Sequence, residues 1–532
     1  MKLILGMVSG VVIAAVLILW SGTQPDIEVT SATDYLLSWQ DPVTIETRMG
    51  PVTGVSGGKS LAFLGLPYAA PPVGDRRFRA PEPAHAWLHA RDATRFPNVC
   101  IQAEPPALLG GDNGHTRSED CLYLNIFTPS TQGDKRAVLF WIHGGSYTGG
   151  SANGYDGSIL AEQGNVVVVT INYRLGMLGF LDLSAYGDEF LGSASNGIRD
   201  QILALQWVRD NISDYGGDAG NVTLFGESAG GGSVLAIMAS PSADHLYHRT
   251  IDHSGGEVHK PPIDSRTALT QHLNVDHLSL LATLRALSPD AILATQENVQ
   301  WGGGGYVDGA VVTRGIREAI MARGADGVPL IAGSNRDEGT LFSRLIPWYL
   351  YSVIEEAVAE NIVATMSGAQ YVAELKQAHP DDSRKQRFER VWTDLLVRGG
   401  VNAAARASAA GPGGWLYRFD LPASRLPNVG ATHGAEISFT FNQFARNLPA
   451  TAYFYDPQDP VVRRLALSWS NTIIQFAKTG DPNGAGLPHW PKYTAETREA
   501  LILDDNPRIE ANLHAAERAR WGDTESLSVD FR

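Results

Sequence analysis

The sequence lacks the residue patterns that mark several large classes of protein. It has no HExxH pattern and no cluster of Cys and His residues, so it predicts no metal site. It has no long run of Lys or Arg, and its net charge of -15 disfavours nucleic-acid binding, because phosphate contacts need a basic surface. The glycine run at 302–305 is not followed by Lys-Ser or Lys-Thr, which argues against a phosphate-binding loop. We therefore expect no cofactor and no nucleic-acid partner.

Cysteine is scarce, with only Cys100 and Cys121 in 532 residues. The two side chains are either buried free thiols or a disulfide. A disulfide here would close a loop of about 20 residues and contribute roughly 3 kcal/mol in the chain-entropy model. The compartment decides between these alternatives, because disulfides persist in oxidising environments.

The N-terminus indicates the compartment. Lys2 precedes an uncharged, mostly apolar run over residues 3–20, which is typical of an export signal or a short membrane anchor. Leu19 and Trp20 crowd the position where a cleavage site needs small residues, so cleaved and anchored forms remain alternatives. In both forms the protein is exported, and it is periplasmic, secreted or anchored at the cell envelope. Export favours the disulfide.

Residues 1–22 are thus predicted to form a signal peptide or anchor, residues 23–42 a linker, and residues 43–532 a single domain. In this domain short apolar runs alternate with segments of helical periodicity, which is typical of a mostly parallel sheet covered by helices on both faces. The predicted fold class is therefore α/β. The main segments predicted as buried strands are residues 137–142, 166–171, 221–225, 328–333 and 415–419.

The most informative motif is G-x-S-x-G at Gly226–Gly230, between the predicted strand 221–225 and a helix that is predicted to begin near Gly231. A strand that turns sharply into a helix leaves one residue at the apex in a strained conformation, and the flanking positions must lack bulk. The apex side chain then projects above the N-terminus of the helix, which favours negative charge. Ser228 occupies this apex and is the candidate nucleophile.

A serine nucleophile needs a base, and the base needs an acid to orient it. The acid is expected after a strand end and before the histidine in the chain. Asp337 and Glu338 both follow the predicted strand 328–333, and spacing does not choose between them. The histidines beyond them are His379, His433, His489 and His514. His433 is the preferred base because it lies in a loop after a strand, and an unperturbed histidine base predicts loss of activity below about pH 6.

A third part of such a site stabilises the negative charge that develops on the substrate oxygen. The predicted strand 137–142 ends at His143-Gly-Gly-Ser, where glycines allow successive N–H groups to turn toward one point. The candidate donors are Gly144, Gly145 and Ser146, together with Ala229 after the nucleophile. Loss of one such donor typically costs roughly 3 to 4 kcal/mol of transition-state stabilisation.

Several further segments, taken together with these motifs, resemble the type-B carboxylesterase/cholinesterase family of α/β-hydrolases. The resemblance extends from about residue 43 to the C-terminal region. Its segments are residues 65–69, 71–74, 119–125, 172–176, 216–230, 307–309, 337–339, 433–437 and 476–483. It implies an α/β-hydrolase fold with helical insertions around an active-site gorge, and a serine hydrolase that cleaves small carboxylic esters.

The resemblance also implies roles for individual residues. It implies a catalytic triad of Ser228, Glu338 and His433, and therefore favours Glu338 over Asp337. It further implies that Cys100 and Cys121 form the first loop disulfide of the family, and that an ion pair joins Arg77 to Glu119.

Two departures from the family pattern bear on the substrate. Ser146 stands where a third glycine is usual, so a Cβ narrows the pocket. The loop between the two cysteines contains no Trp for cation binding, which disfavours choline esters. An amidase or lactonase with the same triad is an alternative, as is a non-catalytic binding module on the same fold. The sequence does not indicate the oligomeric state.

Overall fold

The computed structural model describes residues 39, 41–57, 59–103, 115–256, 264–299, 301, 303–359, 367–426, 428–446, 454–484 and 486–521. The predicted targeting segment over residues 1–22 lies outside the described residues, as does most of the predicted linker. Among the helices that are described, none has both the length and the apolar character needed to span a membrane.

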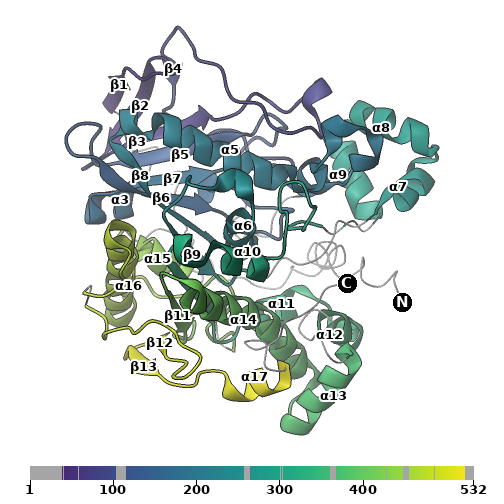
Figure 1. The fold of residues 1–532 in the computed structure, drawn as a ribbon, viewed down its shortest axis with the longest axis vertical. Coiled ribbons are helices and arrows are strands. Elements are labelled where there is room, and N and C mark those ends of the chain that lie inside the picture. Colours follow the sequence, from purple (N-terminus) through teal and green to yellow (C-terminus); the bar gives the residue numbers. More distant parts are fainter. Residues whose placement is uncertain are drawn as a thin grey trace.

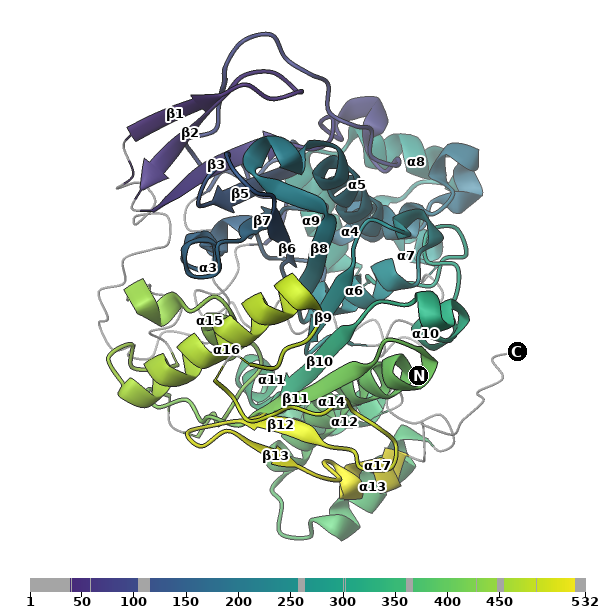
Figure 2. The same cartoon turned by 60° about the vertical axis from the view of Figure 1, so that its left-hand side comes forward.

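A single large sheet organises the described part of the chain (Figures 1 and 2). Its strand order is β1-β2-β3-β5-β7-β6-β8-β9-β10-β11-β12-β13, and β4 pairs with β2. The strands are β1 Asp41–Ile45, β2 Val52–Gly57, β3 Ser60–Pro67, β4 Arg91–Asp92, β5 Tyr123–Thr128, β6 Arg136–Ile142, β7 Val167–Ile171, β8 Gly217–Glu227, β9 Arg249–His253, β10 Leu330–Asn335, β11 Gly414–Phe419, β12 Ala500–Leu503 and β13 Arg508–Glu510.

The strands from β7 to β12 in this order are parallel to one another. The outer strands β1, β2, β3 and β5 at one edge, and β13 at the other, are joined by antiparallel pairing. The prediction of a mostly parallel α/β sheet is therefore confirmed for the centre of the sheet. Short connections link β1 to β2, β2 to β3 and β12 to β13, which fits their antiparallel pairing.

Helices cover both faces of the sheet (Figure 2). They are α3 Ser158–Gly164, α4 Gly176–Phe180, α5 Asn196–Asn211, α6 Ala229–Met238, α7 Arg266–Leu273, α8 His277–Ala286, α9 Pro289–Asn298, α10 Ile316–Arg323, α11 Gly339–Leu345, α12 Tyr351–Ala359, α13 Gly368–Ala378, α14 Arg384–Ala410, α15 Ile437–Thr440, α16 Pro460–Thr479 and α17 Ala515–Trp521. Helices α7 to α10 are inserted between β9 and β10, and α11 to α14 between β10 and β11.

Strand β6 shows why the sheet is buried on both faces. Val138, Phe140 and Ile142 point into a core that includes side chains of α5 and α6. Leu139 and Trp141 alternate with them and point into a second core, which includes side chains of α3 and α16. Successive strand residues face opposite sides of a sheet, so an uninterrupted apolar run fits only a strand with helices on both faces.

Candidate active site

Ser228 occupies the turn between β8 and α6 with φ 56° and ψ −121°, a conformation that costs a non-glycine residue about 1–3 kcal/mol. The close approach of strand and helix explains the flanking glycines. A Cβ on Gly230 would lie 2.1 Å from the carbonyl oxygen of Ile142, and a Cβ on Gly226 would lie 2.5 Å from that of Gly230. The N–H of Ser228 donates to the carbonyl of His253 at 2.9 Å. The predicted sharp strand-to-helix turn is therefore present.

Helix α6 begins at Ala229, two residues earlier than the sequence predicts. Gly231 and Gly232 therefore lie inside the helix, although glycine is a poor helix former. All residues of α6 are buried, so packing against the sheet outweighs this local preference. The early start places Ala229 in the first turn, where its N–H has no partner within the helix.

Glu338 and His433 meet at the end of β10. The Nδ1 of His433 lies 2.6 Å from Oε2 of Glu338. The other oxygen of Glu338 accepts hydrogen bonds from the Ser254 hydroxyl at 2.6 Å and from the Asn335 N–H at 2.7 Å. Glu338 is fully buried, so these three contacts hold its carboxylate in one orientation. The ring of Phe342 lies 5.3 Å from the His433 ring.

Asp337 points away from His433. Its Oδ2 accepts the N–H of Ala431 at 2.9 Å and lies 3.1 Å from the guanidinium of Arg336. The structure thus brings Glu338, and not its neighbour, against the histidine. The role of Asp337 in this geometry is to hold the loop that precedes His433.

The nucleophile and the base lie close to a third side chain, Glu227. The Nε2 of His433 is 3.2 Å from Oε1 of Glu227, the residue before Ser228. Within the described chain no hydrogen bond joins Ser228 to His433. Glu227 is not among the site residues predicted from the sequence. Its position directly before Ser228 in the chain is the one feature of the sequence that could have indicated it.

Three buried carboxylates surround the imidazole. Burial raises the pKa of Glu227 to about 7 and that of Glu436 to about 8, and nearby carboxylates add to both shifts. Burial by itself lowers the pKa of His433. The negative charges of Glu227 and Glu338 outweigh that effect and raise this pKa to about 9. As the pH is lowered, activity should therefore begin to fall at a higher pH than the value near pH 6 that an unperturbed histidine predicts.

The variant Glu227→Gln is expected to move the acid limb of kcat/KM to lower pH. Removal of a negative charge 3.2 Å from Nε2 lowers the pKa of His433, so the base stays neutral at more acidic pH. The shift should be on the order of one pH unit. A pH–rate profile with p-nitrophenyl butyrate measures it, with Glu355→Gln as a matched buried control on α12. If kcat/KM of Glu227→Gln falls at the same acidic pH as that of the unaltered protein, the carboxylate of Glu227 does not affect the pKa of His433.

The other histidines in the C-terminal part do not approach Ser228 in the described contacts. His379 follows α13, His489 is exposed, and His514 lies 6.4 Å from the ring of Trp521.

The loop after β6 carries the candidate oxyanion donors. Gly145 and Ser146 have φ of 106° and 56°, and both are exposed. A Cβ on Gly144 would lie 3.0 Å from the Cβ of Ser228, so the loop rests against the nucleophile. In the part of the chain that the structure describes, the N–H groups of Gly145, Ser146 and Ala229 donate to no protein acceptor. All three are therefore available to a ligand.

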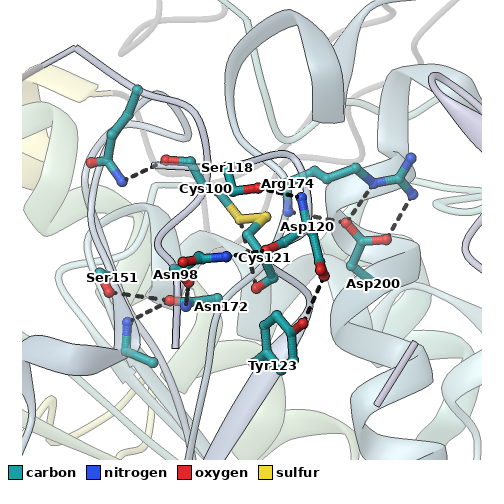
Figure 3. Close-up of a disulfide and its surroundings, with 12 residues drawn as sticks. Asn98, Cys100, Ser118, Asp120, Cys121, Tyr123, Ser151, Asn172, Arg174 and Asp200 are labelled. Carbon is teal, nitrogen blue, oxygen red and sulfur yellow. Dashed lines mark hydrogen bonds and ion pairs between the residues drawn. A yellow bond between two sulfur atoms is a disulfide. The ribbon is translucent and has the colours of Figure 1, made fainter. Parts of the chain in front are cut away.

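The disulfide is confirmed, because an S–S bond joins Cys100 to Cys121 (Figure 3). The expected ion pair is also present. The Nε of Arg77 donates to Oε2 of Glu119 at 2.8 Å, and both side chains are buried. The same guanidinium donates to the carbonyl of Leu287 at 2.6 Å, after the end of α8. These contacts fasten the disulfide loop to the helical insertion.

The central parallel sheet with helices on both faces, and the strand–turn–helix that carries Ser228, define an α/β-hydrolase. A model of the carboxylesterase family matches residues 41–521, and the chain belongs to this family.

Relatives and solved structures agree with this assignment. The chain is 36% identical over 491 residues to the para-nitrobenzyl esterase of Bacillus subtilis (strain 168), covering 90% of this chain and 98% of that protein. It is 33% identical over 515 residues to the human cocaine esterase, covering 89% of each chain. A solved carboxylesterase of Geobacillus stearothermophilus superposes with a TM-score of 0.80 at 33% identity, over 90% of this chain and 100% of that one. The protein is a carboxylic ester hydrolase.

Proposed function

We propose that Ser228, His433 and Glu338 form a catalytic triad that hydrolyses small-molecule carboxylic esters through an acyl-enzyme. The observation that carries the proposal is the 2.6 Å contact between Glu338 and His433 Nδ1, beside the turn that presents Ser228. Glu338 accepts a hydrogen bond from the Nδ1–H of His433, so that in the neutral imidazole the proton is on Nδ1 and Nε2 is free of it. A neutral Nε2 is the form that removes a proton from a serine hydroxyl.

In the first step Ser228 Oγ bonds to the ester carbonyl carbon while its proton passes to Nε2 of His433. This requires the imidazole to exchange its contact with Glu227 for one with Ser228, and such contacts tighten once substrate is bound. The C–O bond to the alcohol then breaks, and Nε2 returns the proton to the departing oxygen. Water repeats the sequence on the acyl-enzyme and releases the acid.

The carbonyl oxygen becomes negatively charged in each tetrahedral intermediate. We propose that the N–H groups of Gly145, Ser146 and Ala229 hydrogen-bond to it, and that Gly144 lies against Ser228 without being one of these three donors. The lack of protein acceptors for these three groups supports this assignment. Donors that are already oriented stabilise the charge without reorganisation during the reaction.

A fluorophosphonate probe tests the proposal directly. The probe forms a covalent bond with an activated serine, so it should modify Ser228 and stop ester hydrolysis in the same proportion. Mass spectrometry of the labelled peptide identifies the site. Modification at a different serine, or activity that survives full modification of Ser228, would contradict the proposed nucleophile.

The preferred substrate is a separate question. A panel of esters, amides and lactones distinguishes an esterase from an amidase or lactonase with the same residues. Because one relative is a para-nitrobenzyl esterase, para-nitrobenzyl esters belong in the panel. Ester turnover well above amide and lactone turnover is expected. A higher kcat/KM for amides would favour the alternative.

Ser146 predicts discrimination against esters of tertiary alcohols. Its Cβ stands in the exposed loop next to the nucleophile, where glycine would leave room for a branched alcohol. We expect kcat/KM for tert-butyl acetate to be far below that for n-butyl acetate, and Ser146→Gly to narrow the difference. Equal hydrolysis of the two acetates by the unaltered protein would contradict the prediction.

We also propose that residues 43–532 act as one catalytic domain, exported by the segment at residues 1–22. The match of the family model over residues 41–521 supports a single domain. The disulfide supports an oxidising compartment. Fractionation of the producing cell, with N-terminal sequencing of the mature protein, distinguishes a cleaved form from an anchored one.

A further inference from the structure

The loop that carries the oxyanion donors folds back on itself. A Cβ on Gly145 would lie 2.2 Å from the carbonyl oxygen of Gly149. A Cβ on Gly150 would lie 2.5 Å from the carbonyl oxygen of Gly144. The N–H groups of Thr148 and Gly149 both donate to the Gly145 carbonyl at 3.0 Å. The second half of the loop therefore lies in direct contact with the first, and a displacement of Gly150 would displace Gly144 and Gly145.

Gln102 holds Gly150 at both of its backbone polar groups. The N–H of Gly150 donates to Oε1 of Gln102 at 2.8 Å. The side-chain amide of Gln102 donates to the carbonyl of Gly150 at 3.0 Å and to that of Cys100 at 3.1 Å. Gln102 is 1% exposed, while Gly150 is partly exposed, so the amide reaches the loop from the protein interior. A buried amide that makes all of these contacts fixes the position of Gly150 relative to Cys100.

The disulfide secures the segment from which Gln102 projects. Cys100 lies two residues before Gln102 and is bonded to Cys121. The same segment is tied to the region after the loop by a second amide, since Asn172 donates to the carbonyl of Asn98 at 3.1 Å and accepts the N–H of Ala152 at 2.8 Å (Figure 3). A continuous set of contacts thus runs from the disulfide to the loop.

We propose that Gln102 is a positioning residue for the oxyanion donors, and that the disulfide acts on catalysis through it. The inference rests on the proposed oxyanion role of Gly145 and Ser146. Gly145, Ser146 and Tyr147 have φ of 106°, 56° and 60° in succession. Such strained conformations persist only where the surrounding structure imposes them. Gln102 supplies that restraint at the far end of the loop.

The test compares Gln102→Leu with Gln163→Leu. Gln163 on α3 is a matched control, because its amide also makes three hydrogen bonds: with Ser470, Asn471 and Asn442 at 2.7–2.9 Å, away from the loop. For Gln102→Leu we expect kcat for p-nitrophenyl butyrate to fall by about ten- to a hundredfold, because small displacements of oriented groups have effects of this size. KM should change by less than about threefold. The affinity for a trifluoromethyl ketone, which forms a tetrahedral oxyanion on the serine, should fall in parallel with kcat.

A double-mutant cycle connects Gln102 to the disulfide. Replacement of both Cys100 and Cys121 by Ser should lower kcat in the unaltered protein but have little further effect in Gln102→Leu, because groups that act through one another are not additive. If Gln102→Leu does not fold, Gln102→Glu serves in its place. That variant keeps an acceptor for the Gly150 N–H and loses the two amide donor contacts.

Kinetic constants are expressed per fluorophosphonate-reactive site, so loss of folded protein does not count as loss of catalysis. The proposal is overturned if Gln102→Leu keeps kcat and inhibitor affinity within about twofold, or if it only lowers the melting temperature as Gln163→Leu does. If the unaltered protein is not labelled at Ser228, the proposed function fails instead, so the two failures are distinct.

Discussion

Ser228→Ala is expected to lower kcat for p-nitrophenyl butyrate by roughly 10⁵- to 10⁶-fold, the loss that follows removal of a serine nucleophile in other hydrolases. Alanine has no atom that can bond to the carbonyl carbon, so the acyl-enzyme route is closed. The turn itself should survive, because Ser228 contributes its backbone N–H to the His253 carbonyl at 2.9 Å and alanine retains that group. Residual activity should reflect substrate binding and the oxyanion donors alone.

Ser240→Ala is a matched control for this variant. Ser240 lies just beyond the end of α6, where its hydroxyl contacts that of Ser242 at 2.9 Å; it is fully buried, whereas Ser228 is partly exposed. Its activity should stay near that of the unaltered protein, and its melting temperature calibrates the effect of losing a buried hydroxyl. Initial rates measured on protein purified from a host without endogenous esterases check the result. Hydrolysis by Ser228→Ala within tenfold of the unaltered protein would refute the nucleophile.

Glu338→Gln is expected to lower kcat by about 10³- to 10⁴-fold, although it changes only a few atoms. The oxygen Oε1 accepts hydrogen bonds from both Ser254 and Asn335, so the amide oxygen of glutamine should occupy that position. The amide NH₂ would then face Nδ1 of His433 and donate to it. Nδ1 would become an acceptor and Nε2 would carry the proton, which is the wrong tautomer for removing a proton from Ser228.

The neighbouring variant Asp337→Asn provides the control. The amide oxygen of asparagine can still accept the Ala431 N–H, and only the exposed pairing with Arg336 is lost. Activity within about threefold of the unaltered protein is expected, because exposed ion pairs contribute little. Steady-state kinetics on the two variants distinguish the acids. A large loss in Asp337→Asn with a small loss in Glu338→Gln would reverse the assignment.

Much of the fold follows from local patterns in the sequence. The central strands are continuous apolar runs because they are buried on both faces, and β7, with all of Val167–Ile171 buried, is the clearest case. Helix α14 occupies Arg384–Ala410, a segment whose residue pattern is itself typical of a helix. The predicted start of α6 is wrong, because packing against the sheet outweighs the low helix propensity of Gly231 and Gly232. The antiparallel outer strands carry a weaker signal, because several of their residues are partly exposed.

In the active site, too, some residues can be predicted from the sequence and others only from the tertiary structure. The sequence alone determined the candidate nucleophile, since a strand, two flanking glycines and a helix are consecutive in the chain and permit one geometry at Ser228. Spacing in the chain did not choose between Asp337 and Glu338, and the family resemblance favoured Glu338. The tertiary structure shows the physical reason, because the two adjacent side chains take different directions as the chain leaves β10 and only that of Glu338 contacts His433. It also brought Glu227 to the imidazole and Gln102 to Gly150. These contacts join loops far apart in sequence, and no local pattern encodes the distance between them.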